Sequence, residues 1–65
     1  MENTPVTKEL YDKLSPFRQG YISYMQGAWN KDVPESNPYQ ETDKAFNAWK
    51  DGNFQAMLDV QDGEE

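Results

Sequence analysis

Acidic side chains are the residues of this sequence best suited to chemistry. Twelve of the 65 residues are Asp or Glu, and paired carboxylates can hold a metal ion or act as an acid and base. The C-terminal string KDGNFQAMLDVQDGEE, however, lacks the D-x-[DN]-x-[DN]-G spacing of a calcium loop. We therefore expect a solvated acidic surface, with no metal ion and no cofactor.

The other residue types that catalysis needs are also missing. The chain has no His and no Cys, which excludes Cys/His catalysis, zinc fingers and disulfides. It has no nucleophile elbow, Walker loop or dinucleotide fingerprint. Two helices of this length also lack the walls that enclose a substrate. The sequence predicts a protein that is not an enzyme.

The charge balance indicates what kind of partner the chain would meet. Six basic residues against twelve acidic ones give a net charge of -6. Five acids follow the last base, Lys50: Asp51, Asp59, Asp62, Glu64 and Glu65. This charge opposes direct contact with nucleic acid and favours basic partners, so Asp59 and Asp62 are candidate contact residues. The N-terminal stretch MENTPVTKEL has no signal-peptide pattern, and we expect a cytoplasmic protein.

Start signals and apolar periodicity predict an all-α fold. Thr4-Pro5, with Thr7 as a second possible cap, begins a short helix over residues 5–14, and Ser15-Pro16 begins another over 16–29. Thr42 followed by Asp43 begins a helix over 42–59.

The expected architecture is therefore a small helical hairpin of two main helices joined by a long loop, plus the short N-terminal helix. One domain spans residues 4–60, between a frayed N-terminus at 1–3 and a disordered acidic tail at 61–65.

The two main helices carry small residues where they would meet. At 100° per residue, an aromatic stripe on the 16–29 helix predicts the core: Phe17, Tyr21, Tyr24 and Ala28. Gly20 and Gly27 border this stripe, although each glycine costs about 1 kcal/mol in a helix interior. The 42–59 helix places small residues around Trp49 on one face: Ala45, Ala48, Gly52 and Ala56. We expect Gly20 and Gly27 to seat against this face.

The loop has one segment that favours order. Asn37-Pro38-Tyr39 combines an asparagine that can bond its own backbone with a proline of fixed φ. We expect Tyr39 to anchor the loop by a hydroxyl bond to the 16–29 helix. The sharper hypothesis is that Tyr39 binds a partner by stacking on a base.

Four apolar residues have no obvious place in this core. Ile22 and Trp29 share the border of the aromatic stripe opposite the glycines, and aromatic residues are enriched at interfaces. Phe54 and Leu58 project opposite Trp49 and would either pack on the N-terminal helix, at Leu10 and Leu14, or meet a partner. Trp29, Ile22, Phe54 and Leu58 are therefore candidate partner-binding residues.

The order of these features resembles the ribosome modulation factor family and its small bacterial and phage relatives. The matching residues extend over about 17–57: Gly20-Tyr21, Gly27, Asn37-Pro38-Tyr39, Ala48-Trp49, Gly52 and Ala56. The resemblance implies two helices joined by a long loop and, for ribosome modulation factor itself, ribosome binding that accompanies ribosome dimerisation and silencing. The ribosome-binding members are strongly basic, whereas this chain is acidic.

Two functional hypotheses follow. The first is a small interaction protein of this type that binds and modulates a macromolecular machine, with a ribosomal or nucleic-acid-binding protein as partner and a homodimer as one possible state. The alternative is an acidic inhibitor, such as phages encode, that mimics the charge of nucleic acid and blocks a DNA- or RNA-binding host protein. Added salt would weaken binding by a charge mimic, whereas binding through apolar residues would persist.

Overall fold

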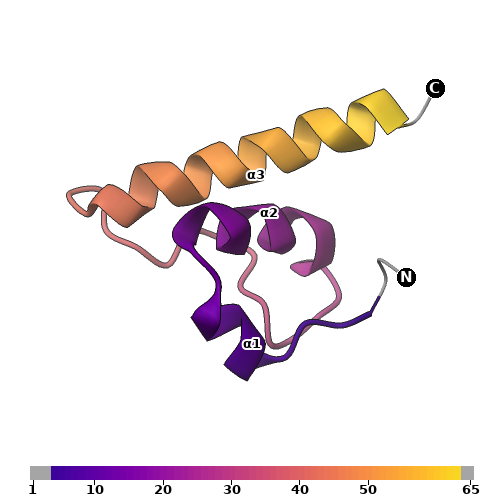
Figure 1. Cartoon of the computed structure of the whole chain (residues 1–65), viewed down its shortest axis with the longest axis horizontal. Coiled ribbons are helices and arrows are strands. Elements are labelled where there is room, and N and C mark those ends of the chain that lie inside the picture. The colour runs from indigo at the N-terminus through magenta and orange to yellow at the C-terminus, as the bar shows by residue number, and fades with distance from the viewer. Residues whose placement is uncertain (1–3, 64–65) are drawn as a thin grey trace.

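Three α-helices make up the secondary structure of residues 4–63, the part of the chain that the computed structural model describes. α1 spans Lys8–Lys13, α2 spans Pro16–Gln26 and α3 spans Lys44–Gly63. In Figure 1, α3 lies along one side of α2 and α1 lies on the opposite side. The all-α class and the pair of main helices joined by a long loop are confirmed. None of these helices is long and apolar enough to cross a lipid bilayer.

An extended segment, residues 4–6, occupies the place where the sequence predicts the start of α1. We call this segment the N-terminal strap. The Gln26 side chain accepts a hydrogen bond from Val6 N at 2.9 Å and donates one to Thr4 O at 3.0 Å. Asn30 Nδ2 donates to Val6 O at 2.9 Å. Because these amides satisfy the backbone as a neighbouring strand would, the strap stays out of the helix.

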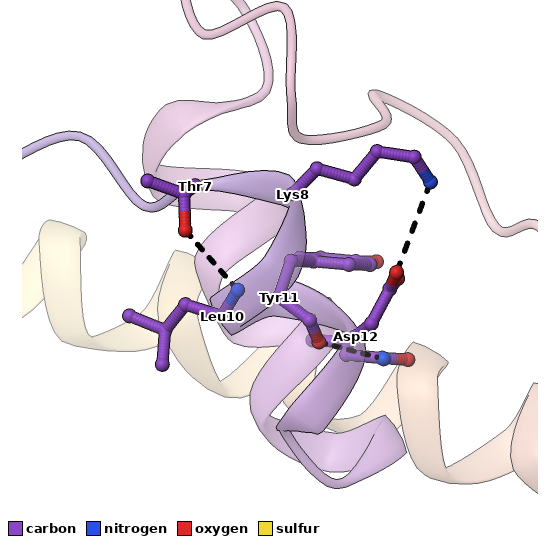
Figure 2. A network of polar contacts seen from close by, with 6 residues as sticks. Thr7, Lys8, Leu10, Tyr11 and Asp12 are labelled. Carbon is purple, nitrogen blue, oxygen red and sulfur yellow. Dashed lines mark hydrogen bonds and ion pairs between the residues drawn. The ribbon is translucent and has the colours of Figure 1, made fainter.

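α1 begins only after the strap. Thr7, not Thr4, is its N-cap, and Thr7 Oγ1 accepts a hydrogen bond from Leu10 N at 3.1 Å (Figure 2). One turn further on, Lys8 Nζ and Asp12 Oδ2 lie 3.8 Å apart as an exposed i,i+4 ion pair. Such a pair contributes less than about 1 kcal/mol, so α1 depends on its packing against the rest of the fold.

α2 begins where predicted and ends earlier. Ser15 caps it by accepting a hydrogen bond from Arg18 N at 3.4 Å, and Pro16 occupies the first turn. At the other end, the backbone N–H groups of Trp29 and Asn30 both donate to Gln26 O, at 3.2 and 2.8 Å. The expected helical residues 27–29 therefore form a turn.

α3 is displaced along the chain from its predicted bounds. The Asp43 carboxylate accepts a hydrogen bond from Ala45 N at 2.9 Å, so Asp43 satisfies the first turn and the helix starts at Lys44 instead of 42. The helix then continues to Gly63, so residues 61–63 are helical, not part of a disordered tail. The expected frayed residues 1–3 and the last two residues, 64–65, lie outside the described part of the chain.

Two glycines set the distance between α2 and α3. A methyl group added at Gly20 would overlap the backbone carbonyl of Trp49, and one added at Gly52 would overlap that of Phe17. None of the described glycines has a positive φ, so their role here is the missing Cβ. The predicted seating of Gly20 against the small-residue face of the last helix is confirmed, with Trp49, Gly52 and Ala56 buried.

Gly27 makes a different contact from the predicted one. A methyl group at Gly27 would lie 3.1 Å from Pro34 O and 3.2 Å from Glu35 Cα, so this glycine packs against the loop and not against α3. Gly27 is the C-cap of α2 and keeps helical dihedral angles, with its N–H donating to Ser23 O at 2.8 Å.

The buried face of α2 is polar, and the predicted aromatic stripe is wrong. Its buried residues are Gln19, Gly20, Ser23 and Gln26. Phe17 and Tyr24 are 42% and 41% exposed, Ala28 is exposed and Tyr21 is half-buried. The backbones approach too closely at Gly20 for a side chain to fit at that point, and the aromatic side chains of α2 lie outside the contact.

Hydrogen bonds tie this polar face to the other two helices. Trp49 Nε1 donates to Tyr11 Oη at 3.1 Å, and Tyr11 Oη lies 3.4 Å from Ser23 Oγ. Gln19 Nε2 donates to Tyr11 O at 2.9 Å. Among the described residues, every buried side-chain nitrogen and oxygen has a hydrogen-bond partner, as a buried polar core requires.

The Asn37-Pro38-Tyr39 segment anchors the loop as predicted. Asn37 Oδ1 accepts a hydrogen bond from Tyr39 N at 3.0 Å, and Asn37 Nδ2 donates to Phe46 O at 2.9 Å. The Tyr39 hydroxyl donates to Gln19 Oε1 at 2.5 Å. The loop is thereby fixed to both main helices.

The glycine contact gives a stability prediction. We expect Gly20→Ala and Gly52→Ala each to lower the free energy of unfolding by about 2 kcal/mol or more, because overpacking against rigid backbone strains the core. The measurement is urea denaturation followed by circular dichroism. Gly63→Ala is the control, since a methyl group there meets nothing within 4 Å. Equal effects at Gly20 and Gly63 would contradict the close contact.

Candidate protein-binding face

An apolar hollow lies between α1 and α2. It has a volume of about 570 Å³. The residues that line it are Val6, Leu10, Leu14, Phe17, Arg18, Tyr21 and Ile22. Arg18 is the only charged residue among them, so the walls are almost entirely apolar. The hollow is open to solvent, so it suits an elongated or broad partner better than an enclosed small molecule.

A second hollow of about 400 Å³ adjoins the first. The two share Val6, Tyr21 and Ile22, and the second continues towards Met25 and Trp29. The outer side of α2 therefore carries one continuous apolar surface. We call it the apolar face, made of eight residues: Val6, Leu10, Leu14, Phe17, Tyr21, Ile22, Met25 and Trp29.

The side chains of this face are unusually exposed for their size. Leu10 is 50% exposed, Phe17 42%, Met25 38% and Trp29 54%. By contrast, only four apolar residues of the described chain are buried: Tyr11, Val33, Trp49 and Ala56. More large apolar side chains thus lie on this one face than in the core, and contiguous patches of this kind mark interaction sites.

The polar core positions the apolar face. The N-terminal strap supplies Val6, and its backbone is held by Gln26 and Asn30. α1 supplies Leu10, and Leu14 is its C-cap residue. The buried Tyr11 between them bonds to α2 and α3. Each wall of the face is therefore fixed from behind by hydrogen bonds.

The Tyr21 side chain links the apolar face to α3. Its hydroxyl donates to Asp59 Oδ2 at 2.6 Å, and Asp59 Oδ1 accepts a hydrogen bond from Gln55 Nε2 at 2.9 Å. The bond from Tyr21 is the main reason that the pKa of Asp59 is lowered from its usual 3.8, and the Gln55 bond adds to it. The same bond, followed by desolvation and the Asp59 charge, raises the pKa of Tyr21 above its usual 10.0.

Two of the predicted partner-binding residues lie together on this face. Ile22 is half-buried in both hollows and Trp29 lies at the far end of the second. Trp29 projects from the turn after α2, not from the helix itself.

The other predicted contact residues lie elsewhere. Phe54 is 58% exposed and Leu58 half-buried on α3, and neither lines the two hollows. Leu10 and Leu14 instead line the groove with residues of α2, so they do not form the expected cluster with Phe54 and Leu58. Asp59 and Asp62 are exposed on α3, and only Asp59 reaches the apolar face, through Tyr21.

Tyr39 is half-buried at a separate hollow of about 460 Å³. This hollow has two lysines and two aspartates among its walls: Lys8, Lys31, Asp12 and Asp32. The Tyr39 hydroxyl is engaged with Gln19, which confirms its predicted role as loop anchor. Stacking on a base stays a prediction.

Sequence reasoning missed several walls of the face. Phe17 was expected in the core, and Val6 and Met25 received no role. A signal for Phe17 was available, because at 100° per residue it lies about 60° from Gly20 around the helix, so a helix that buries Gly20 can hold Phe17 beside the contact. Val6 gave no such signal, since its position depends on Gln26 and Asn30, which are 20 and 24 residues away.

Neither metal chemistry nor known relatives assign an activity to this surface. Within residues 4–63, no group of three or more acidic, His or Cys side chains could hold a metal ion. No protein-family model, curated protein or solved structure matches the chain. The resemblance to ribosome modulation factors stays a prediction.

The Tyr21 to Asp59 bond predicts a pH dependence of stability. The bond needs a protonated phenol and an ionised carboxylate. A lowered Asp59 pKa contributes stability above the usual value of 3.8 that is lost as the pH falls through the folded-state value. A raised Tyr21 pKa contributes stability below 10.0 that is lost as the pH rises through the folded-state value.

We therefore expect Tyr21→Phe to be less stable than the wild type at neutral pH and to lose this difference at an acidic pH below the lowered folded-state pKa of Asp59. Urea titrations at both pH values measure it. Tyr24→Phe is the matched control, because no hydrogen bond joins Tyr24 to a carboxylate in the described chain. A stability difference that is the same at both pH values would contradict the role of the ionised carboxylate.

Proposed function

We propose that this chain is a non-enzymatic binding protein that modulates a macromolecular machine by docking a protein partner on its apolar face. The observation that carries the proposal is the continuous apolar face, with Leu10, Phe17, Met25 and Trp29 between 38% and 54% exposed. Interfaces bury such aromatic and aliphatic side chains at their centres.

Charge argues for a protein partner over nucleic acid. The net charge is -6, and the only charged side chain that lines the larger hollow is Arg18. A phosphate backbone needs several basic contacts, which this face does not offer. A cytoplasmic ribosomal or nucleic-acid-binding protein is the class of partner that we propose.

The residues that resemble ribosome modulation factors mostly support the fold. Gly20, Gly52 and Trp49 form the contact between α2 and α3, and Asn37 and Tyr39 hold the loop. Their placement supports a shared architecture. These residues do not identify the partner. The apolar face would bind the partner, and of its eight residues only Tyr21 belongs to the resembling motif.

The second candidate is the acidic mimic of nucleic acid. Asp51, Asp59 and Asp62 are exposed and lie within an arc of about 80° along α3, at 100° per residue. A basic cleft on a DNA- or RNA-binding protein would bind this stripe mainly through charge. Added salt would then weaken binding steeply.

Affinity capture from the native host with matched variants tests the proposal. We expect Trp29→Ala to reduce the captured partner at least tenfold and Phe54→Ala to leave it unchanged, although the two rings are equally exposed, at 54% and 58%. Binding through the apolar face should persist in about 0.5 M NaCl, where the Debye length is only a few Å. Sedimentation with ribosomes identifies whether the machine is the ribosome.

Two outcomes would contradict the proposal. If Phe54→Ala abolishes capture and Trp29→Ala does not, the outer side of α3 is the binding surface. If salt or competing nucleic acid releases the partner, the chain acts as a charge mimic.

A further inference from the structure

The hollow beside Tyr39 has the size of a small-molecule site. Its volume is about 460 Å³, and sites for small ligands typically measure about 300 to 1,000 Å³. We call it the charged hollow, and the residues that line it are Lys8, Tyr11, Asp12, Gln19, Lys31, Asp32, Pro34, Pro38 and Tyr39. None of these residues belongs to the apolar face, so a ligand here would be independent of the proposed function.

The charges of this hollow balance, although those of the chain do not. α1 supplies one lysine and one aspartate, Lys8 and Asp12, and the segment after α2 supplies Lys31 and Asp32. The lining therefore carries two positive and two negative charges, in a chain whose net charge is -6. A ligand with a single sign of charge would meet repulsion as well as attraction there. We infer that the charged hollow binds a small zwitterion, a molecule with both an ammonium and a carboxylate, such as a free amino acid or a short peptide with free ends.

The charged groups of the hollow are available to such a ligand. Among the described residues, the side chains of Lys31 and Asp32 form no ion pair. Lys8 Nζ and Asp12 Oδ2 are paired at 3.8 Å, but both side chains are exposed. Because an exposed pair contributes little to stability, either group can exchange this contact for one with a ligand. The ammonium and the carboxylate of a bound zwitterion would form charge-assisted hydrogen bonds with an aspartate and a lysine.

Uncharged and backbone groups hold the hollow in place. Gln19 and Tyr11 are 5% and 6% exposed, and Gln19 Nε2 donates to Tyr11 O. The Tyr39 hydroxyl donates to Gln19 Oε1, which ties the loop to α2. In the segment after α2, Asp32 N donates to Asn30 Oδ1 at 3.0 Å. A site whose walls are already held loses less conformational freedom when a ligand binds.

NMR titration of the ¹⁵N-labelled full chain tests the inference, with alanine and trialanine as the probes. We expect at least one of these two zwitterions to cause saturable shifts of amide signals within residues 31–39. The probe that binds more tightly distinguishes a free amino acid from a peptide. N-acetylation or C-terminal amidation of that probe removes one of its two charges and should weaken binding about tenfold, the loss expected of a hydrogen bond to a charged group.

A second Lys-Asp dipeptide in the chain supplies a matched control. Lys31→Ala and Asp32→Ala should each weaken binding of the probe several-fold. Lys50 and Asp51 follow one another in the same order on α3 and are equally classed as exposed, but they do not line the charged hollow. Lys50→Ala and Asp51→Ala should therefore leave binding unchanged.

Four outcomes would overturn the inference. They are no saturable shift with either probe, equal affinity for the zwitterion and its blocked forms, no loss of binding in Lys31→Ala and Asp32→Ala, and an equal loss in the two control variants. Capture of a protein partner that depends on Trp29 would survive any of these results, because the charged hollow and the apolar face share no residue.

Discussion

The close approach of two backbones at Gly20 and Gly52 is the constraint on which the rest of this structure depends. Each glycine faces a main-chain carbonyl of the other helix, that of Trp49 or Phe17. Because a main-chain carbonyl cannot rotate away as a side chain can, no side chain fits at positions 20 and 52. The buried surface of α2 is consequently lined by polar and small residues, which need hydrogen-bond partners, and the large apolar residues are displaced to the outer side. The polar core and the apolar face are two results of one contact.

Much of this fold follows from local rules of sequence. The Ser15-Pro16 start, the Asn37 turn and the small face around Gly52 each depend on residues close together in the chain, and each is confirmed. The start of α1 was not predictable in this way. It is decided by the side chains of Gln26 and Asn30, which bind the strap from a distant part of the sequence.

The candidate site was less predictable than the fold. Hydrophobic periodicity assumes that the largest apolar side chains point to the core, and this assumption fails on a helix whose buried side is set by a glycine. Phe17 was therefore assigned to the wrong side of α2. Ile22 and Trp29 were expected outside the core, and Ile22 is half-buried and Trp29 54% exposed. The residues that contact Leu10 could be identified only from the three-dimensional structure, because α1 faces α2 and not the outer side of α3.

The N-terminal strap supplies one wall of the apolar face through Val6. Three backbone hydrogen bonds join it to the side chains of Gln26 and Asn30. Breaking these three bonds would therefore break no turn of α2 or α3. Val6, which lines both hollows, would leave with the strap, and the two hollows would then join. The amide proton of Val6 accordingly reports, through its exchange with solvent, on the opening of the groove itself.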